Sequence, residues 1–166
     1  GAARGAAALG AVLCTVHASA GRRAMEAAAQ ALATAPAGPD GRRPALLGVT
    51  VLTSLGSDEL AEIAPSAEGL TERVLRLARL AWDSGCDGLG CAPVDLPALR
   101  AQLGAEPLVV TPGIRPAGAG ADDQSRIATA REARDAGADF LVVGRPVARA
   151  ADPAAALAML ADELVT

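Results

Sequence analysis

Lysine, asparagine and tyrosine are absent from this 166-residue sequence, and aromatic residues make up only 1% of it. All fifteen basic residues are therefore arginines. A reaction that needs a lysine side chain cannot be carried out by these residues alone, whatever fold they adopt.

Other shortages exclude whole classes of protein. The net charge is −4, which gives no basic surface for nucleic acid. No apolar run approaches the length of a membrane span, and no segment resembles a signal peptide. The three cysteines, Cys14, Cys86 and Cys91, are odd in number and lack metal-ligand spacing. We therefore expect a cytoplasmic protein with reduced thiols and no metal site, in which Cys86 and Cys91 pack at strand ends.

What the sequence does contain is a regular alternation of patterns. Just over half of the residues are apolar, which is enough for one domain with a core. Short apolar runs predict strands at 11–16, 45–52, 86–91, 107–110 and 140–143. Helical patterns occupy 1–10, 22–33, a short stretch from 58 to Pro65, 70–84, 93–103, 124–136 and 152–164, the last with Asp152 as its N-cap. Strict alternation of this kind predicts a parallel sheet.

Every loop with glycine or polar residues follows the carboxyl end of a predicted strand. Both α/β barrels and open α/β sheets bind their ligands at that edge. No GxGxxG motif follows the first strand, so a dinucleotide-binding fold has no positive support.

Two of these loops offer an arginine and a glycine each. Gly144-Arg145 comes directly after the last strand, where a glycine lets a phosphate approach the backbone N–H and an arginine can bind it at two points. Gly113 and Arg115 follow the preceding strand in the same way. A solvated Gly-Arg turn is the alternative, but the pairing of the two loops favours a phosphate site.

The segment 116–123, PAGAGADD, is too rich in glycine and alanine to pack, which suits a lid that orders over a ligand. Gln124 could reach a phosphate oxygen, and Asp122 or Asp123 is expected to cap the next helix. Thr53 could bond a ligand ring or ribose, or local backbone. The only histidine, His17, has no partner at ligand spacing, and we expect a structural role for it.

The motifs together resemble those of one family. VHASAGRRAMEAA (16–28), GVTVLTS (48–54), TPGIRP (111–116), DDQSRIATAREARDAGADFLVVGRPV (122–147) and ADP (151–153) occur in the order seen in bacterial orotidine 5′-phosphate decarboxylases. The resemblance covers nearly the whole chain. It implies a (β/α)8 barrel, usually a homodimer, that converts orotidine 5′-monophosphate into UMP and CO2 without a cofactor or metal.

The same resemblance implies which residues contact the substrate. These are Thr53, Arg115, Gln124, Gly144 and Arg145. Gln124, Arg145 and the Gly144 amide resemble the family's phosphate grip. The loop from Arg115 to Gln124 resembles its closing lid.

One departure from the family pattern is large. The family's catalytic segment has the form Asp-x-Lys-x-x-Asp, preceded by two strands that end in an Asp and a Lys, and none of this is present. In the family that lysine protonates the carbon that loses CO2. We therefore expect residues 1–166 to form a single, incomplete barrel domain, strands four to eight, with no catalytic residue and no activity alone.

Two other interpretations stay open. The chain could be a non-catalytic phosphate-binding fragment, whose two exposed sheet edges would make it associate or dissolve poorly. It could also belong to a related barrel enzyme that acts on another sugar phosphate. TPGIRP together with DDQ favours the nucleotide enzyme.

Overall fold

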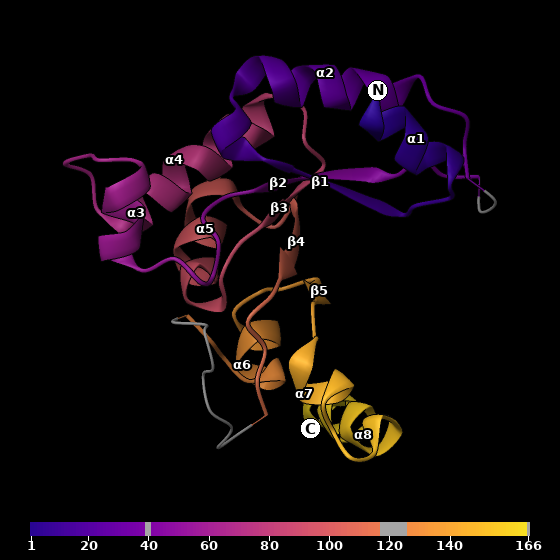
Figure 1. Cartoon of the computed structure of the whole chain (residues 1–166), viewed down its shortest axis with the longest axis vertical. Coiled ribbons are helices and arrows are strands. Elements are labelled where there is room, and N and C mark those ends of the chain that lie inside the picture. Colours follow the sequence, from indigo (N-terminus) through magenta and orange to yellow (C-terminus); the bar gives the residue numbers. More distant parts are fainter. Residues whose placement is uncertain (39–40, 117–125, 166) are drawn as a thin grey trace.

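The computed structural model describes residues 1–38, 41–116 and 126–165. In it the chain folds into a curved parallel sheet with helices along one side (Figure 1). The strands are β1 (Leu13–His17), β2 (Ala45–Val49), β3 (Gly88–Gly90), β4 (Leu108–Thr111) and β5 (Phe140–Leu141). The helices are α1 (Ala2–Ala8), α2 (Arg22–Ala33), α3 (Ser57–Ile63), α4 (Leu70–Asp83), α5 (Leu96–Leu103), α6 (Ala130–Asp135), α7 (Arg145–Ala148) and α8 (Pro153–Val165), with single 3-10 turns η1 (Ala18–Ala20) and η2 (Pro93–Asp95).

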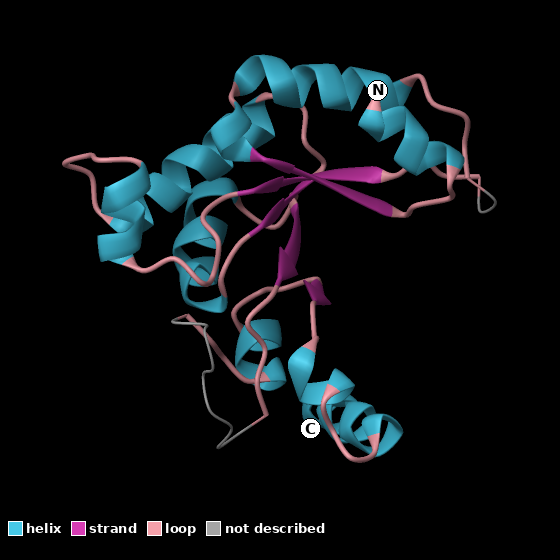
Figure 2. Cartoon of the chain, viewed as in Figure 1, coloured by secondary structure: helices cyan, strands magenta, loops and turns pink. Residues whose placement is uncertain are grey.

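The strands lie side by side in chain order, and all neighbouring pairs are parallel (Figure 2). Each strand returns through a helix on the same side of the sheet, as expected for right-handed βαβ connections. The alternation of strand and helix predicted from the sequence is therefore confirmed. All carboxyl strand ends consequently point to one edge.

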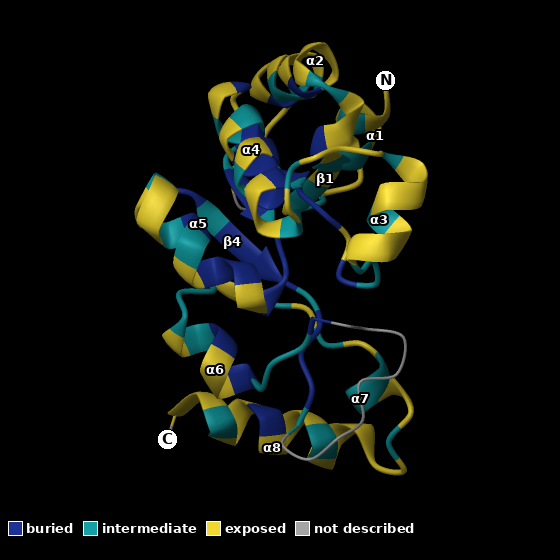
Figure 3. Cartoon of the chain, turned by 90° about the vertical axis from the view of Figure 1, so that its left-hand side faces the viewer, coloured by how far each residue is buried: buried dark blue, intermediate teal, exposed yellow. Residues whose placement is uncertain are grey.

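The two faces of the sheet differ in what covers them. Leu46, Leu89 and Val109 are fully buried in the core that the sheet forms with the helices. Figure 3 shows β4 coloured as largely buried. Burying a leucine completely stabilises the fold by roughly 2 kcal/mol. On the inner face, near the edge strand β5, Phe140 and Val142 remain 49% and 50% exposed. That open edges promote association stays a prediction, which light scattering at rising protein concentration would test.

Helix α4 packs very closely on β2. Its buried face contains Val74, Leu77, Ala78 and Ala81, as its sequence periodicity predicts. A Cβ built on Gly48 of β2 would lie 2.4 Å from the Cβ of Ala81. Glycine and alanine therefore face each other where the helix crosses the strand, because no larger pair fits.

The helix expected at 124–136 begins later than predicted. Helix α6 starts at Ala130, because Thr129 and Glu132 form a capping box in which each side chain accepts the other residue's backbone N–H. The N-cap is thus Thr129 rather than Asp122 or Asp123, which lie outside the described residues. The short helix α7 was not predicted.

At the other boundaries the differences are small. Several strands are shorter than expected, since β2 ends at Val49 and β5 at Leu141. The expected helix at 93–103 begins with the turn η2 before α5. The predicted cap of the last helix is confirmed, because Asp152 Oδ1 accepts the Ala155 N–H at 3.0 Å.

Candidate functional site

Four strands end around a small cavity on the inner face of the sheet. Its volume is about 150 Å³. Thr53, which follows β2 and is 6% exposed, lines it together with Cys91, Pro112 and Val142, which follow β3, β4 and β5. The structure thus brings the predicted contact Thr53 to the place where these strand ends meet.

Arg115 leaves the carboxyl end of β4 as a buried residue. Its backbone N–H donates to the Ala128 carbonyl at 2.9 Å, and the Ala128 N–H donates to the Gly113 carbonyl at 3.2 Å. Its guanidinium donates to the Ile114 carbonyl at 2.9 Å. The chain before residue 117 is thereby held against the chain after residue 125.

Gly144 and Arg145 leave the neighbouring strand β5, since Val110 of β4 pairs with Phe140. Gly144 has a negative φ of −106°, and an added Cβ would meet no described atom within 4 Å. Packing among the described residues therefore does not require a glycine here. Open space beside the Gly144 Cα, with the half-buried Arg145 next to it, suits the approach of a phosphate oxygen.

Of the five predicted contacts, Thr53, Arg115, Gly144 and Arg145 lie at the carboxyl edge of the sheet, and Gln124 lies outside the described residues. The predicted lid, residues 116–123, also lies outside the described residues except for Pro116. Thr53 lines the small cavity, whereas Arg115 and the Gly144-Arg145 pair follow the adjacent strands β4 and β5.

One buried arginine at this edge was not singled out from the sequence. Arg126 is only 7% exposed and forms an ion pair with Asp95 of η2, Nη1 to Oδ2 at 2.6 Å. Its Nη2 donates to the Val51 and Leu52 carbonyls at 3.0 and 3.1 Å. Burial raises the pKa of the Asp95 carboxyl, and the adjacent guanidinium opposes that rise. The sequence signal was its place in DQSR, which helical periodicity obscured.

The two cysteines on either side of β3 are structural. Cys86 and Cys91 are buried in the core, as the sequence predicts. Burial raises the pKa of the Cys86 thiol to about 11 and that of Cys91 to about 12. Both are therefore protonated at neutral pH and unsuited to nucleophilic attack, although Cys91 lines the small cavity.

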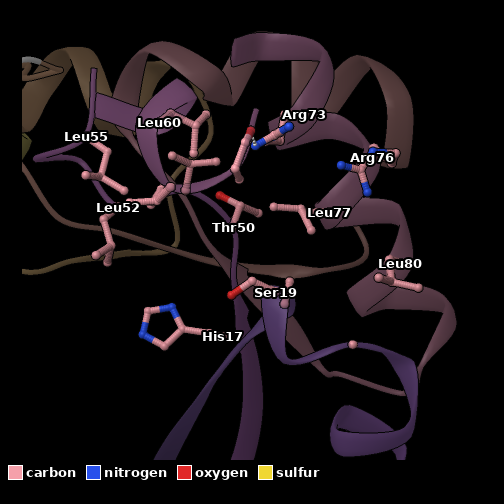
Figure 4. Close-up of a pocket in the computed structure, with 15 residues that line it drawn as sticks. His17, Ser19, Thr50, Leu52, Leu55, Leu60, Arg73, Arg76, Leu77 and Leu80 are labelled. Atoms are coloured by element: carbon pink, nitrogen blue, oxygen red, sulfur yellow. Dashed lines mark hydrogen bonds between the residues drawn. The ribbon is translucent and has the colours of Figure 1, made fainter. Parts of the chain in front are cut away.

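A larger cavity, about 570 Å³, lies between the ends of β1 and β2 and the helices α3 and α4 (Figure 4). Three of its polar residues already have partners: Thr50 Oγ1 donates to the Gly90 carbonyl, and Arg73 and Arg76 both bind Glu68. The exposed His17 lies at its rim. None of the predicted substrate contacts lines it.

Neither a metal-binding cluster nor a membrane-spanning helix occurs in residues 1–38, 41–116 and 126–165. No group of three or more His, Cys, Asp or Glu side chains there could hold a metal ion. No helix in the same ranges is long and apolar enough to cross a membrane.

Comparison with known proteins places these features in one family. The sequence model described as "Orotidine 5'-phosphate decarboxylase / HUMPS family" matches residues 1–160. The chain is 51% identical over 161 residues to the orotidine 5′-phosphate decarboxylase of Pseudomonas aeruginosa PAO1, covering 97% of this chain and 67% of that protein. It is 48% identical over 155 residues to that of Gluconobacter oxydans, covering 93% and 64%.

A solved structure agrees. The orotidine 5′-phosphate decarboxylase from Lactobacillus acidophilus superimposes with a TM-score of 0.84 at 36% identity, covering 99% of this chain and 68% of that one. The chain thus spans about two thirds of the length of the relatives it matches. The five parallel strands are part of a (β/α)8 barrel, and the chain belongs to the orotidine 5′-phosphate decarboxylase / HUMPS family.

Proposed function

We propose that this chain is the nucleotide-binding part of an orotidine 5′-phosphate decarboxylase, which converts orotidine 5′-monophosphate into UMP and CO2. The observation that carries the proposal is the gathering of Thr53, Arg115, Gly144 and Arg145 at one edge of the sheet. Residues 1–166 then form a single, incomplete barrel domain. The complete enzyme is, by the same resemblance, a cytoplasmic homodimer that needs no cofactor.

Each residue has a distinct task in this proposal. The Gly144 amide and the guanidinium of Arg145 bind the 5′-phosphate, with Gln124 as a further contact. Thr53, at the apolar cavity, contacts the nucleoside part, and Arg115 contacts the substrate from the end of β4. Phosphate binding far from the reacting bond lowers the barrier only if it is stronger in the transition state than in the ground state.

None of the 166 residues can carry out the proton transfer of the family pattern, because no lysine occurs among them. In the family pattern a lysine protonates the carbon that loses CO2. The chain by itself is therefore expected to bind UMP but not to decarboxylate orotidine 5′-monophosphate.

A chimera tests the proposal directly. This chain would replace the matching two thirds of the Pseudomonas aeruginosa decarboxylase, to which it is 51% identical. We expect UMP formation by the purified chimera and none by the 166-residue chain. An inactive but folded chimera would contradict the assigned function, and decarboxylation by the chain alone would contradict the assigned lack of a catalytic group.

Calorimetry on the chain separates the nucleotide enzyme from a related sugar-phosphate enzyme. The proposal requires UMP to bind more tightly than ribose 5-phosphate. Equal affinities would favour the related sugar-phosphate enzyme, and no binding of either ligand would count against a phosphate site.

A further inference from the structure

Arg126 joins three loops that are far apart in the sequence. Its two terminal nitrogens bond Asp95, after β3, and the carbonyls of Val51 and Leu52, after β2. Its own chain segment is paired with the end of β4 through Ala128. A planar guanidinium can serve these acceptors simultaneously, whereas a lysine ammonium on a flexible stem cannot match the same geometry.

The two carbonyls belong to the peptide planes immediately before Thr53. On the other side, Thr50 donates both its N–H and its hydroxyl to the Gly90 carbonyl, at 3.0 and 3.1 Å. Residues 50–52 are therefore held between β3 and Arg126. The direction in which Thr53 enters the cavity follows from the orientation of these planes.

Stability alone does not account for such a contact. A buried ion pair is often no more stabilising than apolar side chains of similar volume, because both charges lose their hydration. Arg126 and Asp95 are 7% and 3% exposed, so that cost applies to both. What an ion pair adds over apolar packing is a fixed geometry.

We propose that Arg126 is a positioning residue that orients Thr53 and thereby makes the site selective for a nucleoside monophosphate over a bare sugar phosphate. The inference rests on the proposed function, which gives Thr53 the nucleoside and gives Gly144 and Arg145 the phosphate. It predicts that loss of Arg126 affects one half of the ligand and not the other.

The test compares UMP and ribose 5-phosphate as ligands of the 166-residue chain by calorimetry. Arg126→Lys is expected to weaken UMP binding about tenfold, or roughly 1.4 kcal/mol, and to leave ribose 5-phosphate within about twofold. Thr53→Val should likewise lower the ratio of the UMP affinity to the ribose 5-phosphate affinity. If Arg126 acts through Thr53, the double variant binds UMP no more weakly than Thr53→Val alone.

Arg100→Lys is the matched control. Arg100 also bridges loops, since it bonds the Gly137 and Pro107 carbonyls and pairs with Asp139, but it does so at the opposite edge of the sheet. This variant should lose stability without changing the ratio of the two affinities. An equal loss for both ligands in Arg126→Lys, or additive effects in the double variant, would overturn the inference.

Hydrogen exchange gives a readout independent of ligand. Arg126→Lys should speed exchange at the amides of residues 51–53 while those of β2 stay protected, and Asp95→Asn, which keeps the carbonyl bonds, should do so less. Unchanged exchange in a folded Arg126→Lys chain would show that Arg126 does not hold residues 51–53 in place. Failure of the wild-type chain to bind UMP would instead reject the proposed function. Hydrogen exchange would still decide whether Arg126 holds residues 51–53 in place.

Discussion

Arg43 and Asp87 form a two-point ion pair at the amino end of the sheet, with Nη1–Oδ2 at 2.8 Å and Nη2–Oδ1 at 2.5 Å. Asp87 also accepts the Leu46 N–H at 2.8 Å, which ties the start of β3 to β2. The same arrangement recurs two strands later, where Asp139 accepts the Val109 N–H at 2.7 Å and pairs with Arg100 at 2.9 Å.

These ties should matter for stability and not for binding. Asp87→Ala and Asp139→Ala each remove an ion pair and leave a strand N–H without its acceptor, so we expect a loss of about 1–3 kcal/mol in the free energy of unfolding. Urea denaturation measures it. Asp135→Ala, which removes an exposed pair with the adjacent Arg134, should change stability by less than about 0.5 kcal/mol. Losses as small for Asp87→Ala would show that the ties contribute little.

Gly48 is one of two glycines of the sheet that should not tolerate a methyl group, the other being Gly88 of β3, where a Cβ would lie 2.3 Å from the Leu108 carbonyl oxygen. Gly48→Ala places a Cβ 2.4 Å from that of Ala81, so α4 must shift, and we expect a loss of about 1–3 kcal/mol in thermal or urea unfolding. Gly5→Ala is the contrasting change, because Gly5 lies within α1 with open space around it. There alanine should stabilise by roughly 0.5–1 kcal/mol, since it favours the helix. A neutral Gly48→Ala would mean that the helix moves freely on the strand.

Stability should depend on acid through Glu68. Hydrogen bonds from Arg76, and then from Arg73, lower the pKa of Glu68 from 4.5 to about 2. A carboxyl whose pKa is lower in the folded state stabilises the fold above its unfolded pKa and loses that contribution as the pH falls through the folded value. The difference in unfolding free energy between the wild type and Glu68→Gln should therefore be greatest near neutral pH. It should shrink as the pH falls from 4.5 towards about 2. A difference that stays constant over this range would contradict the paired carboxylate.

Arg145 should govern the phosphate and not the base. Arg145→Ala removes a charge-assisted contact, and we expect about a tenfold to hundredfold loss of affinity for both UMP and ribose 5-phosphate. Calorimetry on the same chain gives both values. Arg149→Ala, an exposed arginine one turn further on, is the control and should bind like the wild type. Equal UMP affinity in Arg145→Ala would remove the phosphate assignment.

Local patterns predicted the elements well, because the strands are buried apolar runs and α4 carries one apolar face. The bounds of α2, Arg22–Ala33, follow from such a pattern. The start of α6 was missed because Arg126 and Ala128 fit a helical period, yet pairing with Ile114 and the Thr129 cap decide the matter. Tertiary contacts there outweigh local propensity.

The site was predictable only where a loop motif follows a strand. Gly144-Arg145 and Thr53 could be placed at the carboxyl edge because parallel strands all end there. The partners of Arg126 could not be read from the sequence, since Val51 and Leu52 lie 75 and 74 residues away and offer only carbonyls. A backbone acceptor leaves no trace in residue type.

The arginine–aspartate ties of Arg43 with Asp87 and Arg100 with Asp139 stand at the opposite edge from the ligand loops. Substitutions in the ligand loops therefore do not disrupt these ion pairs, and the sheet keeps its stability when a loop changes. A scaffold divided in this way can explore new ligands one loop at a time, and Arg126 marks the exception, because it couples three of those loops and makes them change together.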